Sequence, residues 1–535
     1  MKKIYSLLFI ITTTAVFAQN PHWEWLTGIE SAFANPQQDM VTDALGNMYT
    51  CAIFTKDIIT DDYEIHNTNP QTNDSFFAKL NSQGQVLWTK KLGGAGSDNI
   101  GGFDADAAGN VYITLTYTNG ITVGDQTFTG LGTLFAKYDT NGNLVWVRSG
   151  TFTFMNSLRV DSAGNIYAAG TFQGGAFTYD QTTLTYSGSV PSFIVKLNNN
   201  GNLVWSGIIG GPQNNSKYND VKDIEIDSLG NVYVGGTYNG GNITFGSLTL
   251  NSVDSGNFFL VKYNSEGVAQ WAKTSGNSAC ANAIWDMTLD NAGNIYLAGN
   301  FCSTVNFNDT TLTSGTGSRF FIAKYDTSGT LAWIKSSIPG PFNIVHSADF
   351  DADGNLVIGG TFNGGVSFGN NVSLTSASSA QYVAFYNADG FAQWAVATGE
   401  IDINNTVCVK AMGNHTIYTA GHIIIPSLTF GDMTYTKTGQ NTYNIWLGKL
   451  VYEDVAETQQ FSKTAVAVYP NPVNDVLTVQ SENSVQNISV TDCNGRTVAV
   501  ASNSKTINTS QLSKGIYFAS VTTATGKSVH KIVKN

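Results

Sequence analysis

Two short patterns of apolar and polar residues alternate along most of the chain. The first is clear at residues 319–335, where the apolar run 320–325 stops at Asp326 and Gly329 and alternation then resumes up to Trp333. Asp can accept hydrogen bonds from nearby backbone groups and Gly adopts positive φ without strain, so this pair favours a tight turn. The pattern therefore predicts a β-hairpin.

The second pattern occurs at residues 290–301. Asp290 and Gly293 mark another turn, and residues 295–299 leave it as a nearly continuous apolar strand. A strand that is apolar on both sides is covered on both sides, which requires stacked sheets. Together the two patterns predict repeats of four β-strands each.

Both patterns recur at intervals of 55 to 66 residues. An internal period of this size is typical of β-propeller blades or of a solenoid. The turn aspartates of the repeat are Asp43, Asp106, Asp161, Asp227, Asp290 and Asp351. The tryptophans of the repeat are Trp25, Trp88, Trp146, Trp205, Trp271, Trp333 and Trp394.

The two ends of the repeat region favour a closed ring over a solenoid. The seventh copy, at residues 444–450, lacks the tryptophan strand, whereas a single strand with Trp25 precedes the first repeat. Pairing of these two segments would remove exposed sheet edges. We therefore expect an all-β protein with a seven-bladed β-propeller, four strands per blade, in which the N-terminal strand closes the last blade. The seventh copy departs most from the pattern, with Lys410 in place of the turn aspartate.

Residues 22–450 resemble the bacterial family of seven-bladed propeller repeats with Asp-x-x-Gly-Asn-x-Tyr-x-x-Gly signatures. The resemblance implies a scaffold or interaction module of a secreted surface protein and leaves the ligand open. Each repeat also contains a predicted small hairpin, as at residues 243–250 and 366–374. Loops on a rigid scaffold often carry function, so we expect a ligand at this face, near tips such as Asn242 and Asn370.

The first eighteen residues have the features of a secretory signal peptide. Lys2 and Lys3 precede an apolar run over residues 4–17, and Ala18 ends a small-residue cleavage site before Gln19. The alternative is a membrane anchor, but the apolar run is too short to span a bilayer. We expect no transmembrane segment elsewhere.

Composition narrows the possible partners. Charged residues make up only 12% of the chain, which suits short strands and turns better than helices. The formal net charge of −12 becomes more negative when Lys2 and Lys3 are removed. We therefore expect no nucleic-acid partner and no binding to anionic lipid. A monomer is expected.

The repeat ends near residue 450. Residues 451–464 form a polar predicted linker, and residues 465–535 alternate apolar residues with turn signals, which predicts a small Ig-like β-sandwich. The expected domains are a signal peptide (1–18), a propeller (19–450), a linker (451–464) and a C-terminal sandwich (465–535).

The C-terminal sandwich resembles the type A sorting domain of the type IX secretion system of Bacteroidetes. The residues that carry the resemblance are Tyr469, Pro470, Asn471, Pro472, Asp492, Gly495, Arg496, Gly515, Tyr517, Lys531 and Lys534. The resemblance implies recognition by the translocon and a carrier barrel, followed by removal by a surface sortase. It implies a protein that is extracellular or anchored to the outer cell surface. The alternative is an ordinary Ig-like accessory domain.

The sequence shows no convincing catalytic set, and its histidines form no His-Glu-x-x-His motif. We expect no cofactor, with one calcium candidate at Asp349, Asp351 and Asp353, whose alternating carboxylates resemble the start of a calcium loop. The five cysteines have no zinc-binding spacing. Cys280 and Cys302 lie within one repeat and either pair or remain buried thiols.

Three functions fit these features. The first is a non-enzymatic binding or adhesion module that recognises a glycan or a protein through the hairpin face. The second is a secreted polysaccharide lyase or glycosidase, which an acidic pair converging on the propeller axis would favour. The third is a structural spacer of the cell surface, which predicts no ligand.

Overall fold

The computed structural model describes residues 21–31, 40–59, 62–151, 153–172, 175–186, 192–210, 219–239, 241–252, 256–275, 283–307, 310–337, 342–401, 407–413, 415–437, 443–452, 466–481, 483–492, 496–523 and 526–535. Every helix or strand assigned in these ranges is a β-strand, which confirms the all-β class. Within them no helix is long and apolar enough to cross a membrane. The predicted signal peptide lies outside the described residues.

Most strands before residue 452 belong to groups of four antiparallel strands that follow one another along the chain. We call each group a unit and number its strands in order of pairing. The first strands are β2 (Val41–Thr42), β8 (Asp98–Ala105), β14 (Thr153–Val160), β20 (Asn219–Ile226), β26 (Ala283–Leu289), β30 (Phe342–Phe350) and β34 (Val407–Met412). The second strands are β3 (Met48–Phe54), β9 (Val111–Tyr117), β15 (Ile166–Phe172), β21 (Val232–Tyr238), β27 (Ile295–Phe307), β31 (Leu356–Gly369) and β35 (Thr416–Ile423).

The outer half of each unit contains its third and fourth strands. The third strands are β6 (Asp74–Leu80), β12 (Gly132–Tyr138), β18 (Ser192–Leu197), β24 (Asn257–Tyr263), β28 (Thr310–Tyr325), β32 (Val372–Tyr386) and β38 (Tyr443–Val451). The fourth strands are β7 (Val86–Leu92), β13 (Leu144–Gly150), β19 (Leu203–Ile209), β25 (Ala269–Thr274), β29 (Leu331–Ser336), β33 (Ala392–Ile401) and β1 (His22–Ser31).

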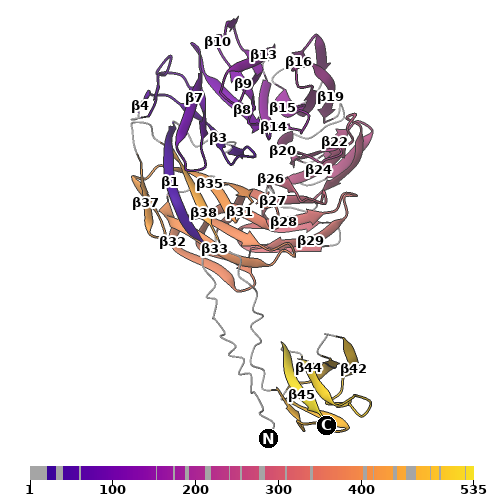
Figure 1. Cartoon of the computed structure of the whole chain (residues 1–535). Helices are drawn as coiled ribbons and strands as arrows, with labels where there is room; N and C mark the ends of the chain where they lie inside the picture. Colours follow the sequence, from indigo (N-terminus) through magenta and orange to yellow (C-terminus); the bar gives the residue numbers. More distant parts are fainter. Residues whose placement is uncertain are drawn as a thin grey trace. The chain divides into compact units, whose positions relative to one another are not determined.

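The fourth strand of the last unit comes from the beginning of the chain. β1 pairs antiparallel with β38, and Trp25 lies opposite Lys449. Figure 1 shows the indigo β1 beside the orange strands of this unit. Because His22 lies opposite Val451, the chain enters and leaves this part of the molecule at the same end of the strand pair.

The first strands of consecutive units contact one another, β8 with β14, β14 with β20, β20 with β26, β26 with β30 and β30 with β34. In Figure 1 the labels of β8, β14, β20 and β26 run along the inner side of the units. Most first strands also carry a bulge, as between Ile284 and Asp286 and between Val345 and Ser347. We call these first strands the inner strands.

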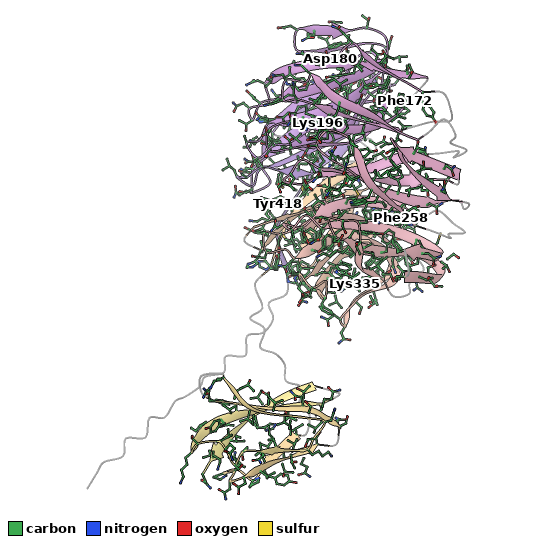
Figure 2. All side chains as sticks on the ribbon, turned by 90° about the vertical axis from the view of Figure 1, so that its right-hand side faces the viewer. Phe172, Asp180, Lys196, Phe258, Lys335 and Tyr418 are labelled. Carbon is green, nitrogen blue, oxygen red and sulfur yellow. The ribbon has the colours of Figure 1, made fainter. Side chains whose placement is uncertain are left out.

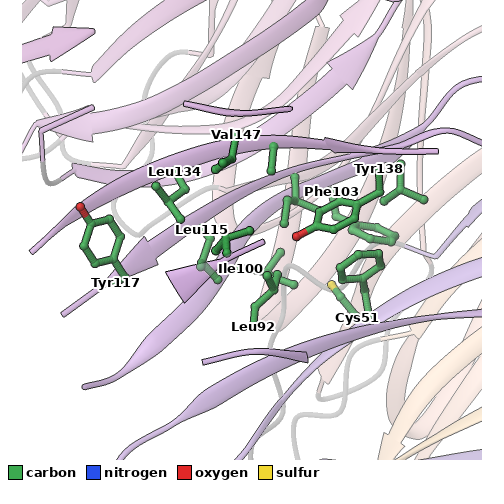
Figure 3. Packing of buried hydrophobic residues seen from close by; sticks show 14 of the residues in the cluster. Cys51, Leu92, Ile100, Phe103, Leu115, Tyr117, Leu134, Tyr138 and Val147 are labelled. Atoms are coloured by element: carbon green, nitrogen blue, oxygen red, sulfur yellow. The ribbon is translucent and has the colours of Figure 1, made fainter. Parts of the chain in front are cut away.

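The hydrophobic cores lie between units. One cluster joins Tyr49 and Phe77 of the first unit to Phe103 and Leu115 of the second (Figure 3). Similar clusters join the later pairs of consecutive units. A further cluster joins the last unit to the first, with Cys408 and Leu447 against Met48 and Phe76. Since each fully buried Phe or Leu contributes about 1.5–3 kcal/mol, this face-to-face stacking is a main source of stability. The arrangement is β-propeller-like.

Small hairpins connect the second and third strands, as expected. They are β4 (Ile58–Ile59) with β5 (Glu64–Ile65), β10 (Ile121–Val123) with β11 (Gln126–Phe128), β16 (Ala176–Tyr179) with β17 (Thr182–Thr185), β22 (Gly241–Phe245) with β23 (Leu248–Ser252), and β36 (Ser427–Phe430) with β37 (Met433–Thr436). In the fifth and sixth units the long strands β27, β28, β31 and β32 themselves form the hairpin. Asp180, labelled in Figure 2, and Gln181 form the tip of one hairpin with positive φ.

The C-terminal residues form a separate compact unit. One sheet contains β39 (Val466–Tyr469), β40 (Val476–Ser481) and β43 (Thr506–Asn508), and the other contains β42 (Thr497–Ser502), β41 (Val485–Thr491), β44 (Gly515–Thr523) and β45 (Gly526–Lys534). Val479, Ile488 and Ile532 belong to the core of this unit. Two sheets that share such a core form a small β-sandwich.

Candidate functional site

The repeated aspartates hold the turns of their own units. In the fifth unit, Oδ1 of Asp290 accepts hydrogen bonds from the backbone N–H groups of Ala292 and Asn294. Its Oδ2 accepts from the Asn294 amide at 2.7 Å and from the Tyr296 hydroxyl at 3.2 Å. The same bonds recur at Asp43, Asp106, Asp161 and Asp227. These carboxylates therefore stabilise the scaffold.

Asp351 has the same role with a different hydroxyl donor. Its Oδ1 accepts from the N–H groups of Asp353 and Asn355, but Val357 stands where the other repeats with a turn aspartate carry a tyrosine. The hydroxyl of Tyr452, which follows β38, instead donates to Oδ2 of Asp351 at 2.9 Å. Tyr452 thus supplies the hydroxyl donor that the tyrosine of the other repeats provides and that Val357 cannot provide.

The residues of the calcium candidate belong to two different networks. Asp351 holds its turn, whereas Oδ2 of Asp349 accepts a hydrogen bond from the backbone N–H of Ala411 at 2.8 Å. Within the described ranges, no group of three or more His, Cys, Asp or Glu side chains is arranged to hold a metal ion. Calcium binding by Asp349, Asp351 and Asp353 stays a prediction.

The repeated tryptophans connect neighbouring units. The indole N–H of Trp88 donates to the carbonyl of Thr140 in the next unit at 3.2 Å. Trp25 makes the equivalent bond from the last unit to Ser82 of the first, at 3.1 Å. The same bond is made by Trp146, Trp205 and Trp271, while Trp333 lies against Gly390 and Trp394 against Phe385.

The inner strands place ionisable side chains around the axis. At one level, opposite the second-strand position that carries tyrosine in most units, these strands carry Asp104, Arg159, Glu225, Thr288, Asp349 and Lys410. Two residues earlier, two inner strands carry Asp223 and Asp286. Lys410 lies in β34 opposite Tyr418. The expectation that Lys410 occupies the turn position is therefore wrong. Lys410 precedes its cross-strand tyrosine by eight residues, as Glu225 does, and Met412 holds the place of the turn aspartate.

Arg159 is the centre of this charged group, which we call the axial cluster. Its guanidinium contacts Oδ1 of Asp223 and Oε1 of Glu225, each at 3.0 Å. Ser157 donates to the same Asp223 oxygen at 3.1 Å. Lys410 lies four units further along the chain than Arg159. Its ammonium group interacts electrostatically with Arg159, Asp349 and Asp286. Side chains from separate units therefore converge on the axis.

The carboxylates of the axial cluster also join each unit to the next. Asp223 accepts a hydrogen bond from the backbone N–H of Met287, and Asp286 accepts one from Ala348. Asp104 and Asp349 occupy the position two residues further along their inner strands. They accept equivalent hydrogen bonds from the backbone N–H groups of Val160 and Ala411. An inner strand has an unpaired edge toward the axis, and each carboxylate binds an N–H group on that edge of the following unit.

Burial changes the acidity of the axial cluster. It raises the pKa of Glu225 to about 7 against the opposing effect of Arg159, and that of Asp104 to about 6. Burial and the adjacent Asp223 hold the pKa of Asp286 well above its usual value. Burial alone would lower the pKa of Lys410, but Asp349 and Asp286 outweigh it and raise that pKa. Burial therefore favours the protonated form of Glu225, Asp104 and Asp286 up to a higher pH than in water.

The hairpins bury their apolar residues between units instead of presenting them to solvent. Phe307 packs against Phe258 of the preceding unit at 5.2 Å and against Phe321 at 5.0 Å; Phe258 is labelled in Figure 2. Asn370 donates a side-chain hydrogen bond to the carbonyl of Ala392, whereas Asn242 is exposed on β22. Asn370 is therefore a structural tip residue.

A cleft of about 690 Å³ lies where the hairpin of the fourth unit meets the third unit. Its walls include Tyr186, Ser206, Thr244, Ser247 and Tyr263, together with several glycines. None of the described side chains that line it is charged. Hydroxyl groups, aromatic rings and exposed backbone therefore determine its chemistry.

The predicted sorting residues connect the two ends of the C-terminal unit. Asn471 donates to the carbonyl of Lys531 at 2.8 Å and accepts from the N–H of Val533 at 2.9 Å. The peptide bonds before Pro470 and Pro472 are cis, and Tyr469 is exposed. Asp492 pairs with Arg496 at 3.1 Å, and Gly495 lies outside the described residues.

The remaining sorting residues lie on β44 and β45. The hydroxyl of the buried Tyr517 donates to the carbonyl of Ser513 at 2.9 Å. Gly515 lies opposite Lys534, which is buried, whereas Lys531 is exposed. Ile516, Phe518, Val529 and Val533 are exposed apolar residues of the same two strands. A face of this kind is typical of an interaction surface.

Comparison with known proteins identifies the C-terminal unit. Residues 467–535 match the family described as Secretion system C-terminal sorting domain. This domain indicates export by the type IX system and an extracellular or cell-surface location, as expected. It also implies interaction with the secretion machinery.

Comparison with solved structures gives only weak likenesses for the rest of the chain. A chain of the Mitotic Checkpoint Complex is 9% identical with a TM-score of 0.42, covering 85% of this chain and 99% of that chain. The Dos1 propeller is 9% identical with a TM-score of 0.34 and 96% coverage of both chains. A duf4221 family member from Bacteroides vulgatus is 9% identical with a TM-score of 0.32, covering 64% of this chain and 92% of its own. No curated protein matches the chain.

Proposed function

We propose that residues 21–452 form a closed seven-bladed β-propeller that the type IX system exports as a non-enzymatic binding module. The pairing of β1 with β38 and the hydrophobic cluster between the last and first units support closure of the ring. The bond from Trp25 to Ser82 repeats the contact that joins four other pairs of consecutive units. The repeated aspartates and tryptophans serve this scaffold, so ligand binding falls to residues outside the repeat signature.

The uncharged cleft between the third and fourth units is the observation that carries the binding function. The Tyr186 ring stacks on Phe172 with 6.4 Å between ring centroids, and Ser206 and Thr244 bring hydroxyl groups to the same cleft. Neutral saccharides present hydroxyl groups and apolar C–H faces, which these hydroxyls and aromatic rings complement. The ligand class we propose is therefore a neutral glycan.

Isothermal titration of the mature chain with neutral and acidic polysaccharides tests this function. Tyr186→Ala should weaken binding by roughly fivefold, which corresponds to about 1 kcal/mol of aromatic contact. Thr127→Ala, on the exposed face of another hairpin, is the matched control and should bind normally. Binding that Tyr186→Ala leaves unchanged would contradict the cleft, and no binding by any glycan would favour a protein ligand or a spacer role.

The axial cluster supports a second candidate, a secreted polysaccharide lyase or glycosidase. Arg159 contacts both Glu225, whose pKa burial raises to about 7, and Asp223, which also accepts hydrogen bonds from Ser157 and Met287. These are two carboxyl groups in distinct environments, as such chemistry requires. The bonds from Asp223 and Asp286 to the next inner strand favour a structural role instead. Product analysis after incubation with polysaccharides separates the two. Cleavage that disappears in Glu225→Gln would establish the enzyme.

A further inference from the structure

Two buried carboxylates lie together where the first unit meets the second. Asp74 begins β6 and Asp98 begins β8, and both side chains are completely buried. The backbone N–H of Asp98 donates to the carbonyl of Asn73 at 2.8 Å. A Cβ at Gly93 would lie 2.2 Å from Cγ of Asp74, and the N–H of Gly94 donates to Oδ2 of Asp98 at 2.7 Å. Both carboxylates therefore pack against the same glycine pair.

Each of the two carboxylates has one oxygen without a hydrogen-bond partner. Oδ2 of Asp74 accepts from the N–H of Thr68 at 2.8 Å and contacts Lys91 at 3.1 Å, but its Oδ1 is buried without a partner. Oδ1 of Asp98 is likewise buried without a partner. Lys91 offsets only one of the two negative charges, and a buried unpaired charge is costly. A cation or a proton is needed to complete the pair.

The repeat provides an internal comparison for this position. The residues that correspond to Asp74 and Asp98 at the next junction are Gly132 and Thr153, and further along the chain they are Arg319 and Asn343. No other junction whose two positions are both described has two acids there. The scaffold therefore folds at these places without a carboxylate pair, which leaves the pair at the first junction to be explained by a ligand.

Two backbone carbonyl oxygens lie close to the loop that contains the glycine pair. A Cβ at Gly94 or at Gly96 would lie about 2 Å from the carbonyl oxygens of Gly120 and Thr118, respectively, so these glycines let the carbonyls approach the loop. Calcium is bound by carboxylate and backbone carbonyl oxygens in flexible geometry. We propose that Asp74 and Asp98 form a divalent-cation site, occupied by calcium, that locks the first unit to the second.

The alternative to a metal ion is a proton held by the pair. Burial first, and then repulsion from Asp74, raise the pKa of Asp98 to about 7, while Lys91 and the N–H groups of Gly94 and Thr118 oppose this rise. If only a proton is involved, added calcium neither binds nor changes the unfolding temperature.

Calcium titration of the mature chain after EDTA treatment tests the site, with heat of binding and thermal unfolding as the two readouts. We expect one calcium ion to bind and to raise the unfolding temperature. Asp98→Asn and Asp74→Asn preserve side-chain shape and should each weaken binding more than about tenfold, because a charged ligand is lost. Asp125→Asn, an exposed acid on the turn of the adjacent hairpin, should bind as the native chain does.

The outcomes separate this site from the loop at Asp349, Asp351 and Asp353. Calcium binding that Asp353→Asn removes and Asp98→Asn does not would place the ion in that loop and overturn the proposal. The absence of binding to the native chain at pH 8 would also overturn it. If one Asn variant does not fold, the other variant and calcium binding by the native chain still decide the question. Glycan binding is independent of each of these results.

Discussion

Removing the hydroxyl of Tyr452 tests whether this residue replaces the missing tyrosine of the sixth unit. In Tyr452→Phe the ring still packs against Phe385 and His415, with centroid distances of 4.7 and 5.0 Å. The hydrogen bond to the buried Asp351 is lost. A hydrogen bond to a charged group is worth about 1.5–3 kcal/mol, so we expect a loss of about 2 kcal/mol in the free energy of unfolding.

Denaturant unfolding followed by tryptophan fluorescence is the suitable assay. An unfolding entropy of about 2.1 cal/mol/K per residue over about 430 residues predicts a shift of only about 2 °C in the thermal midpoint. Tyr296→Phe is the matched comparison, because Tyr296 makes the same bond to Asp290 within one unit. Tyr469→Phe changes an exposed side chain and should have no effect. If Tyr296→Phe destabilises the protein and Tyr452→Phe does not, the replacement we describe is refuted.

Two further predictions concern the axial cluster and the sorting domain. Because the pKa of Glu225 is raised in the folded state, its contribution to stability is present below about pH 4.5 and lost as the pH rises through about 7. Glu225→Gln should therefore reduce the fall in the unfolding free energy over this pH range relative to the native chain. Burial also lowers the pKa of His346 and His422 to about 4, which makes stability rise with pH between about 4 and 6.5. The test is therefore the difference in unfolding free energy between the variant and the native chain at each pH, and not the pH profile of either protein alone. Replacing the exposed Ile516 and Phe518 by Ser should reduce export, measured as protein in the medium and on the cell surface, while the isolated chain keeps its unfolding midpoint. Normal export of that double variant would exclude this face as the contact with the secretion machinery.

The features that recur in the sequence are those that the structure bears out most directly. Residues equivalent to Asp290, Gly293 and Trp333 recur at a nearly constant interval because each unit forms the same turn and most units make the same tryptophan contact with the next unit. The strand around Trp25 was recognisable as the partner of residues 444–450. The last repeat lacks a tryptophan strand, and the strand around Trp25 is a tryptophan strand without a repeat before it. The sorting domain was recognisable from its motif residues.

The axial cluster and the carboxylate pair at the first junction could not be read from the sequence in the same way. Asp104, Arg159 and Glu225 occupy one structural position, but the six units in which it was located carry five different residue types there, so no motif marks it. The local signal is weak, because other charged residues occur in the same strands, such as Asp220 and Lys222 in β20. Asp74 and Asp98 come together across a unit boundary, and Tyr452 reaches Asp351 over about 100 residues of chain. Such contacts depend on how consecutive units pack against one another and not on periodicity.

The pairing of β1 with β38 has a consequence for the order of folding. These strands are separated by about 420 residues, so bringing them together costs about 5 kcal/mol of chain entropy in a simple loop-closure estimate. Local pairing within each unit is much cheaper, and we expect it to come first. Until β1 docks, the edge of β38 remains open to pairing with other chains. The slowest and most aggregation-prone step is therefore the last one, and every residue up to Val451 must be available before it can occur.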